Sequence, residues 1–278
     1  MNKYAYVLDI SGHNGEVDFA KVKASGIEGV MLKCSEGKDY LAPKFKPNYE
    51  KALAAGLKVG AYHFLRSNKA LDAAKEGRWF GQCVEGLQLE LGLALDIEHE
   101  GVDWDHGPYD EALTARDGYN IVNIFAQNVA KYGRAELYEN EELYLYASID
   151  YFKRFLQNPL LEGYPRWLSN PDKLVFEQPV QAVQYSWSGF VEGVEKAVDL
   201  NLWLEKKAVF DMVELLDQPK RFTILSGSAA EDAEAVDKDL AERPMPEGDL
   251  PQANLSGDLW LIKGSIGQLA VELELRKR

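Results

Sequence analysis

The sequence is poor in cysteine, in histidine and in long apolar runs. It has two cysteines, Cys34 and Cys83, and four histidines among 278 residues. Two cysteines cannot build a disulfide framework, and their spacing is not that of metal ligands, so we expect neither a disulfide-stapled fold nor a structural zinc site. No apolar run approaches the roughly 18 to 20 residues that a helix needs to span a bilayer, so we expect no insertion into membranes.

Basic residues are too few to balance the acidic ones. The chain has 31 Lys and Arg against 45 Asp and Glu, which gives a formal net charge of −14. Contacts with nucleic-acid phosphates need clusters of Lys and Arg, so this balance argues against a nucleic-acid partner. The first residues, MNKYAYVLDIS, carry one lysine and a short apolar stretch that ends at Asp9. This is not the pattern of a secretory signal or transit peptide, and we expect neither.

The sequence does contain a regular alternation of strand-like and helix-like segments. Short apolar runs predict strands at residues 4–11, 29–34, 58–65, 91–98, 143–148, 165–169, 180–187 and 196–203. Apolar residues at helical spacing predict helices at residues 18–25, 44–55, 70–86 and 117–133. This alternation is typical of an α/β protein with a mainly parallel sheet. About eight strands in about 200 residues, with few helices after residue 150, predict a TIM-like (β/α)-type barrel with reduced last helices.

The pattern changes after residue 205. Residues 206–220 contain a helical or extended connector that ends at a proline and a lysine, and they are predicted to form a linker. Residues 221–278 have the order strand, helix, Pro-rich loop and strand. We therefore expect a barrel domain over residues 1–205, followed by the linker and a small C-terminal α/β domain.

Three of the predicted strands carry carboxylates on one face. Side chains alternate along a strand, so Asp96 and Glu98 share one face of the strand at 91–98 with small residues. The opposite face carries Leu91, Leu93, Leu95 and Ile97. In a small barrel the small residues face the axis, which places both carboxylates at the C-terminal mouth, where active sites of such barrels lie. The same alternation places Asp9 and Asp199 on inward faces of their strands.

Paired carboxylates on one strand face have a recognisable chemistry. Side chains two positions apart lie about 7 Å from each other, and two such groups raise one pKa. A protonated acid beside an ionised partner is the equipment of glycoside hydrolysis, where the leaving oxygen must be protonated. A single aspartate at a strand end can also serve only as a helix cap. Carboxylates also bind divalent metals, but such sites usually recruit His or further Asp, so we expect no metal.

Aromatic residues cluster at or near the predicted strand ends. They are Tyr62, Tyr146, Trp167, Tyr185 and Trp187. Flat rings stack on sugar faces, and their polar edges donate hydrogen bonds. The same rings can equally serve as core packing, so the pattern favours a sugar-binding mouth without requiring it.

Seven segments together resemble a known family. They are DISGHNG (9–15), VDFAKVKASGIEGVMLKCSEG (17–37), VGAYHF (59–64), LALDIE (93–98), the strand at Arg166-Trp167, VQYSW (183–187) and VDLNLW (198–203). In this order they are similar to the glycoside hydrolase family 25 muramidases, the Chalaropsis-type lysozymes. The resemblance covers nearly all of residues 4–203. It implies a barrel with helices on only some strands, and cleavage of the β-1,4 bond between N-acetylmuramic acid and N-acetylglucosamine.

The resemblance also assigns roles. Glu98 falls on the general acid, Asp96 on its partner carboxylate, and Asp9 and Asp199 on the flanking aspartates of the site. The residues that fall at or near the sugar groove are Lys33, Tyr62, Tyr146, Trp167 and Gln184, and we add Tyr185 to these substrate-binding candidates. Glu36 matches a structural signature after the second strand. The family's reaction needs no cofactor and no metal.

The order of a barrel followed by a small domain resembles that of bacteriophage endolysins. It implies a C-terminal cell-wall-binding domain, a protein held in the host cytoplasm until a holin releases it, and peptidoglycan in the bacterial cell wall as the partner. Three departures concern subsite contacts: His13-Asn14, the Trp167-Leu168-Ser169 strand, and an acidic stretch at 99–118.

Two readings from other classes stay open. One is a non-catalytic protein that binds cell-wall glycans on the same barrel. The other is a protein whose acidic rim binds a divalent cation. The sequence predicts neither the oligomeric state nor the stereochemical outcome of hydrolysis.

Overall fold

The computed structural model describes residues 4–98, 114–134, 143–170, 172, 174 and 176–208, with the backbone alone for 205–208. The predicted C-terminal domain at 221–278 lies outside the described residues. So do most of the predicted linker at 206–220 and the stretch 99–113.

In the described part of the chain, nine strands form a single sheet that closes on itself. They are β1 (Tyr4–Ile10), β2 (Gly29–Glu36), β3 (Tyr40–Leu41), β4 (Lys58–Phe64), β5 (Leu93–Asp96), β6 (Leu143–Ser148), β7 (Arg166–Ser169), β8 (Val180–Gly189) and β9 (Val198–Ala208). Their order is β1-β9-β8-β7-β6-β5-β4-β2-β3, and β1 also pairs with β2. The β1–β2 pairing closes a barrel, and the two-residue β3 extends one edge beside β2. The predicted barrel is confirmed.

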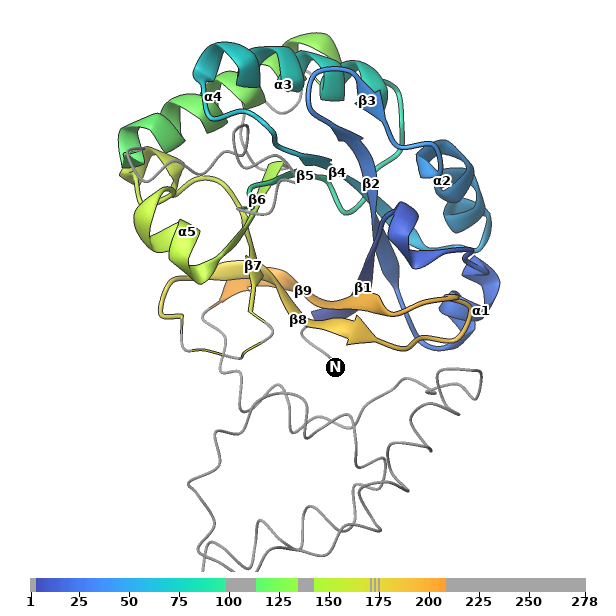
Figure 1. Cartoon of the computed structure of the whole chain (residues 1–278). Helices are drawn as coiled ribbons and strands as arrows, with labels where there is room; N and C mark the ends of the chain where they lie inside the picture. Colours follow the sequence, from blue (N-terminus) through green and yellow to red (C-terminus); the bar gives the residue numbers. More distant parts are fainter. Residues whose placement is uncertain are drawn as a thin grey trace, which may run out of the picture. The chain divides into compact units, whose positions relative to one another are not determined.

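Strand direction explains why helices cover only part of the barrel. The helices are α1 (Phe19–Ala24), α2 (Phe45–Ala54), α3 (Ala70–Val84), α4 (Ala115–Tyr132) and α5 (Ile149–Arg154). They lie outside the strands from β1 to β7 (Figure 1). Parallel neighbours need a crossover, whereas β9 runs antiparallel to both β8 and β1 and needs none. No helix in the described part of the chain is long and apolar enough to cross a membrane.

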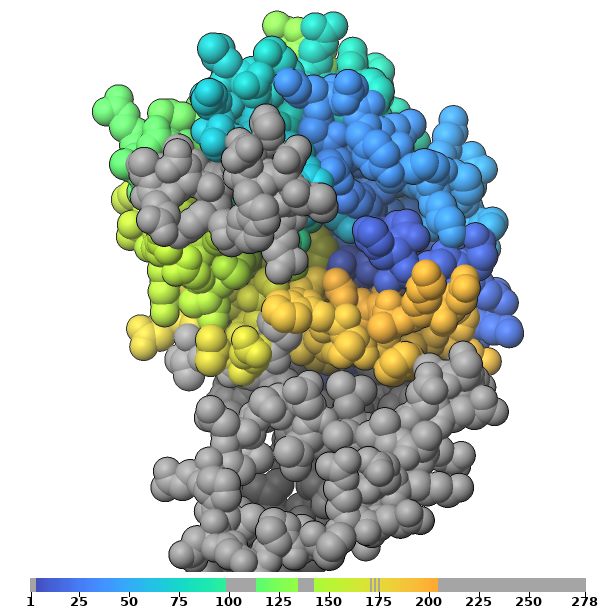
Figure 2. Space-filling model, viewed as in Figure 1, coloured from blue at the N-terminus to red at the C-terminus, as the bar shows by residue number. Residues whose placement is uncertain are grey.

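The first and last strands of the barrel are neighbours. β1 pairs with β9 from Tyr4↔Leu204 to Asp9↔Asp199. The segments beyond these strands also meet, through a bridge between Val17 and Val194. Figure 2 shows the dark blue N-terminal residues directly against orange residues near β9. Both ends of the described chain therefore build the same wall of the barrel.

Alternation along the strands separates two apolar clusters. An outer cluster between strands and helices includes Leu8, Leu93 and Leu95. An inner cluster fills the barrel and consists of Val7, Met31, Tyr62, Leu91, Ala94, Tyr146, Trp167, Ala182 and Trp203. The prediction that Leu91 shares the outer face is wrong. Gly92 has a φ of 76°, so β5 begins only at Leu93 and the alternation does not extend back to Leu91.

Two glycines bring α3 and α4 into backbone contact. A Cβ atom at Gly77 would lie 2.4 Å from the carbonyl oxygen of Phe125, and one at Gly81 would lie 2.9 Å from that of Val129. Any larger residue at Gly77 would push the two helices apart. This close packing fixes α3, which carries Glu76, against the outside of the barrel.

Candidate active site

Three strands deliver carboxylates to one end of the barrel. Asp9 is the second-last residue of β1, and Asp96 is the last residue of β5. The ends of parallel strands in a barrel lie at the same mouth. Asp199 is near the start of β9, but β9 is antiparallel to β1, so its start lies at that mouth as the register partner of Asp9.

Tyr62 on β4 lies among these carboxylates. Burial raises the pKa of its hydroxyl well above the usual value, and the negative charges of Asp9, Asp96, Glu98 and Asp199 raise this pKa further. A single buried ring is thus subject to all four carboxylates that the sequence singled out. The structure brings the predicted acidic residues together around one point.

Asp9 and Asp199 form a hydrogen-bonded carboxyl pair. Burial is the main cause that raises the pKa of Asp199 to about 9, and the charge of Asp9 adds to it. Burial also raises the pKa of Asp9, while hydrogen bonds from Asn201 and Gln184 oppose that rise. Their hydrogen bond raises the pKa of Asp199 and lowers that of Asp9, which makes Asp199 the donor of this bond and Asp9 the acceptor.

Asp96 and Glu98 form a second pair. The strand was predicted to run to residue 98, but β5 ends at Asp96, and the two side chains are hydrogen-bonded instead of standing one strand repeat apart. Burial raises the pKa of Asp96 well above the usual value, and the charge of Glu98 adds to this. The second oxygen, Oδ1 of Asp96, is buried without a hydrogen-bond partner among the described residues.

Gln184 on β8 connects the carboxylates to their surroundings. Its side-chain Nε2 donates to Asp9 Oδ2 at 3.0 Å and to Asp199 Oδ2 at 3.3 Å. Its Oε1 accepts from Tyr146, from Ser169 at 3.1 Å and from the indole of a tryptophan described below. These donors fix the amide with its nitrogen toward the acids, as expected for a residue predicted to belong to the site.

Asn201 is a site residue that the sequence analysis missed. Its Nδ2 donates to Asp9 Oδ2 at 2.7 Å, and its Oδ1 accepts from Trp167 Nε1 at 2.8 Å. Strand alternation in the sequence could have identified it, because Asn201 lies two positions after Asp199 on the same strand face. It links the aspartate at the mouth to the aromatic floor below.

Predicted aromatic residues form that floor rather than an open groove wall. Trp167 on β7 is fully buried and meets Tyr62, Tyr146 and Trp203 edge-on, with ring centroids 6.4, 4.7 and 5.2 Å away. Tyr146 donates its hydroxyl to Gln184 Oε1 at 2.8 Å. The packing orients these rings and the polar groups that they hold.

Tyr185 does not join this group. It packs against the outer cluster, and its pKa is raised by burial and by Tyr4 and Tyr6 on β1, the strand beyond β9. Its side chain thus lies on the outer side of the barrel and is not among the residues that contact the acids. The aromatic residue of this segment that reaches the site is Trp187, whose Nε1 donates to Gln184 Oε1 at 2.8 Å.

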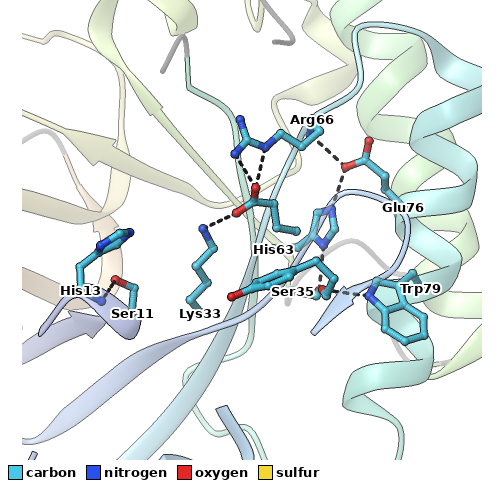
Figure 3. A network of polar contacts seen from close by, with 10 residues as sticks. Ser11, His13, Lys33, Ser35, His63, Arg66, Glu76 and Trp79 are labelled. Atoms are coloured by element: carbon cyan, nitrogen blue, oxygen red, sulfur yellow. Dashed lines mark hydrogen bonds and ion pairs between the residues drawn. The ribbon is translucent and has the colours of Figure 1, made fainter. Parts of the chain in front are cut away.

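Lys33 on β2 is held by a chain of charged side chains. Its Nζ donates to Glu36 Oε2 at 2.7 Å and lies 4.7 Å from the ring centroid of Phe64. Arg66 binds the other oxygen of Glu36 through Nε at 2.7 Å (Figure 3). The charge of Lys33 lowers the pKa of Asp96. Glu36 therefore has the structural place that the sequence suggested, as the anchor of Lys33.

A second polar network lies behind β2 and β4, beside α3. His63 hydrogen-bonds Ser35 Oγ through Nδ1 at 2.8 Å and Glu76 Oε2 through Nε2 at 2.9 Å (Figure 3). Serine, histidine and an acid in this order form a catalytic combination in some hydrolases. Here Ser35 and His63 are completely buried, so no substrate reaches them. We refer to Ser35, His63 and Glu76 as the outer network.

The mouth can carry out proton transfer between carboxyl groups and oxygen. It has two hydrogen-bonded acid pairs, one cation and a fixed amide in a buried setting, which is the donor set for general acid and base catalysis. The described residues contain no group of three or more His, Cys, Asp and Glu that could hold a metal ion.

Comparison with known proteins shows which family the chain resembles. The sequence model of the family described as "Glycosyl hydrolases family 25" matches residues 8–194. The chain is 31% identical over 200 residues to the "Autolytic lysozyme" of Clostridium acetobutylicum, which covers 71% of this chain and 55% of that protein. The chain thus spans about half the length of this curated relative.

Solved structures share the fold. The bacterial lysozyme from Streptomyces coelicolor aligns with a TM-score of 0.59 at 23% identity, covering 73% of this chain and 93% of that one. The CTP1L endolysin aligns with a TM-score of 0.57 at 21% identity, covering 89% of this chain and 85% of that one. With the family match, the barrel and the clustered carboxylates in agreement, the chain belongs to glycosyl hydrolases family 25.

Proposed function

We propose that this protein is a peptidoglycan hydrolase, an N-acetylmuramidase that cleaves the β-1,4 bond between N-acetylmuramic acid and N-acetylglucosamine. Support comes from the family and from the relative named an autolytic lysozyme. Bacterial cell wall is the partner that this reaction requires. A glycan-binding protein without activity has no need for two buried acid pairs, because buried carboxyl groups that repel each other lower stability.

One observation carries the proposal, namely the state of the Asp96–Glu98 pair. Asp96 is buried and hydrogen-bonded to Glu98, and burial and the charge of Glu98 raise its pKa well above the usual value, which favours one shared proton in the pair. Glu98 follows the end of β5 and is the more exposed member. We assign Glu98 as the general acid that protonates the glycosidic oxygen, with Asp96 as the partner that keeps the proton in the site.

The unpartnered oxygen of Asp96 suggests which group attacks the anomeric carbon. A buried acceptor without a donor is unfavourable, and a substrate N–H would satisfy it. N-acetylmuramic acid carries a 2-acetamido group whose carbonyl oxygen can attack the anomeric carbon while its N–H donates to Asp96 Oδ1. Hydrolysis by this route retains the anomeric configuration. The alternative is that Asp9, the acceptor of the other pair, activates a water on the far face and inverts the configuration.

We extend the proposal to the whole chain by its order of domains. Residues 1–205 form the catalytic barrel, 206–220 a linker and 221–278 a cell-wall-binding domain. We propose that the protein is a phage endolysin that a holin releases from the host cytoplasm to the cell wall. The likeness to the CTP1L endolysin extends over 89% of this chain and supports this reading. Deleting 221–278 should reduce sedimentation of the protein with cell walls.

The decisive experiment compares the wild type with Glu98→Gln on purified peptidoglycan. We expect release of fragments that end in reducing muramic acid, identified by mass spectrometry. Loss of the general acid should reduce the rate by about 10²–10⁴-fold while the circular dichroism spectrum stays the same. If the variant keeps its activity, the assignment of Glu98 is wrong. Binding of walls without any release by the wild type would favour the non-catalytic reading.

A further inference from the structure

Trp187 is unusual among the tryptophans of the barrel. Its side chain is 58% exposed, whereas Trp167 and Trp203 are 2% and 6% exposed. Covering a large flat apolar surface that is otherwise left in water is favourable. If the ring faces the site, a bound ligand can therefore cover it.

The irregular end of β8 turns Trp187 toward the site. Gln184 pairs with Asn201, but Ser186 pairs with the adjacent Leu200, so β8 has one residue more than β9 over this interval. A second register shift follows between Ser186 and Gly189. Bulges of this kind re-aim side chains and are frequent next to active sites. The hydrogen bond from the Trp187 indole to Gln184 shows the direction that results.

The same hydrogen bond fixes the ring relative to the acids. Gln184 Oε1 accepts the indole N–H at 2.8 Å, and Gln184 Nε2 donates to Asp9 and Asp199. One edge of the ring is therefore tied to a residue that touches both carboxyl groups. The residues on either side, Ser186 and Ser188, are small.

We propose that Trp187 is a stacking platform that binds the pyranose face of an N-acetylhexosamine adjacent to the bond that is cut. This inference rests on the proposed function, since it requires a glycan in the mouth. Sugar C–H groups present an apolar face that matches an aromatic ring in size, and the ring edge is already anchored. The platform adds affinity for the glycan and sets its position over Asp9 and Asp199.

The test measures binding without turnover. In the full-length Glu98→Gln protein, titration calorimetry with a soluble tetrasaccharide of alternating N-acetylglucosamine and N-acetylmuramic acid gives the parent Kd. Adding Trp187→Ala should weaken binding about tenfold, because stacking is lost. Adding Trp187→Phe should weaken it no more than about threefold, because a ring remains although the N–H is lost. Adding Leu160→Ala is the matched control, since Leu160 is 66% exposed in a turn that leads into the other end of β7.

Each outcome has a distinct meaning. Weakening by Ala but not by Phe, with Leu160→Ala equal to the parent, supports the platform. Equal weakening by Ala and Phe would assign the effect to the lost hydrogen bond and overturn the stacking role. Unchanged affinity in both variants also overturns it, while the parent's own binding leaves the proposed function in place. If the parent does not bind the tetrasaccharide, the proposed function and the platform fall together.

Discussion

Two buried polar regions lie on opposite faces of the barrel sheet, one outside β2 and β4 and the other at the inner mouth, and they are built in opposite ways. The outer network satisfies its members: both ring nitrogens of His63 are bonded, and Glu76 Oε2 also accepts from the Arg66 backbone N–H at 3.0 Å. The acids at the mouth are placed against like charges, and Asp96 Oδ1 has no partner in the described part of the chain. Buried polar groups with hydrogen-bond partners stabilise a fold. Carboxyl groups buried next to like charges have perturbed pKa values, which are typical of functional sites.

The two regions respond to pH with opposite sign. Burial lowers the pKa of His63, so the folded state resists a proton that the unfolded chain accepts, and stability is lost as pH falls below about 6.5. Burial raises the pKa of Asp199 to about 9 from an ordinary 3.8, so the folded state keeps a proton that the unfolded chain releases. That contribution is fully present below pH 3.8 and is lost as pH rises toward about 9.

Breaking the outer network should have the largest effect on stability. Glu76→Ala removes the acceptor of both His63 and the Arg66 backbone N–H and leaves a cavity under α3. We expect the free energy of unfolding, measured in urea, to fall by about 3–5 kcal/mol. Lys75→Ala, one position away on the exposed face of α3, should change it by no more than about 0.5 kcal/mol. A small effect of Glu76→Ala would remove the contrast between the two regions.

Asp199→Asn should have an intermediate effect, on the pH dependence of stability and on activity. It tests the contrast between the acids at the mouth and the outer network. Asparagine mimics the protonated acid, because its Nδ2 can donate to Asp9 and its Oδ1 can accept from Gln184. Thermal unfolding is measured at a series of pH values. We expect the stability of the variant at pH 7 to equal or exceed that of the wild type, and its decline toward pH 9 to be shallower. Activity at pH 7 should fall by less than about tenfold, since the residue already acts as a neutral donor. Complete loss of activity would instead make Asp199 the ionised base.

Lys33→Met should have the smallest effect, a shift in the pH profile of kcat. Methionine keeps an apolar stem over Phe64 but removes the charge that lowers the pKa of Asp96. The acid pair should therefore titrate at higher pH, and the profile should move up by about 1 unit or less. Lys38→Met, an exposed cation just after β2, makes the same charge change and should leave the profile where it was. A downward shift would contradict the sign assigned to Lys33.

Periodicity alone predicted much of the fold and of the site. The alternation in β1, β5 and β9 placed Asp9, Asp96 and Asp199 on the inner face, and the helix-to-strand alternation predicted the barrel. The helix predicted at residues 18–25 forms as α1, and Asp18 caps it by accepting the backbone N–H groups of Ala20 and Lys21. These features follow from local geometry that repeats along the chain.

Features that break the period could not be predicted in this way. Gly92 interrupts the register before β5, and the bulges in β8 leave Trp187, rather than Tyr185, in contact with Gln184. The outer network joins residues on β2, β4 and α3 whose partners are set by tertiary packing. No spacing in the sequence connects His63 with Glu76.

The closure of the barrel between β1 and β9 also determines when the site can form during folding. Asp9 and Asn201 are bonded across 192 positions of sequence, so the site requires the last strand as well as the first. Contacts over such separations form late, because a long loop must close first. During synthesis from the N-terminus, β9 leaves the ribosome after the other strands. Until then the barrel wall is incomplete and lacks both Asp199 and Asn201. Completion of translation through β9 is therefore itself the step that creates the acid cluster.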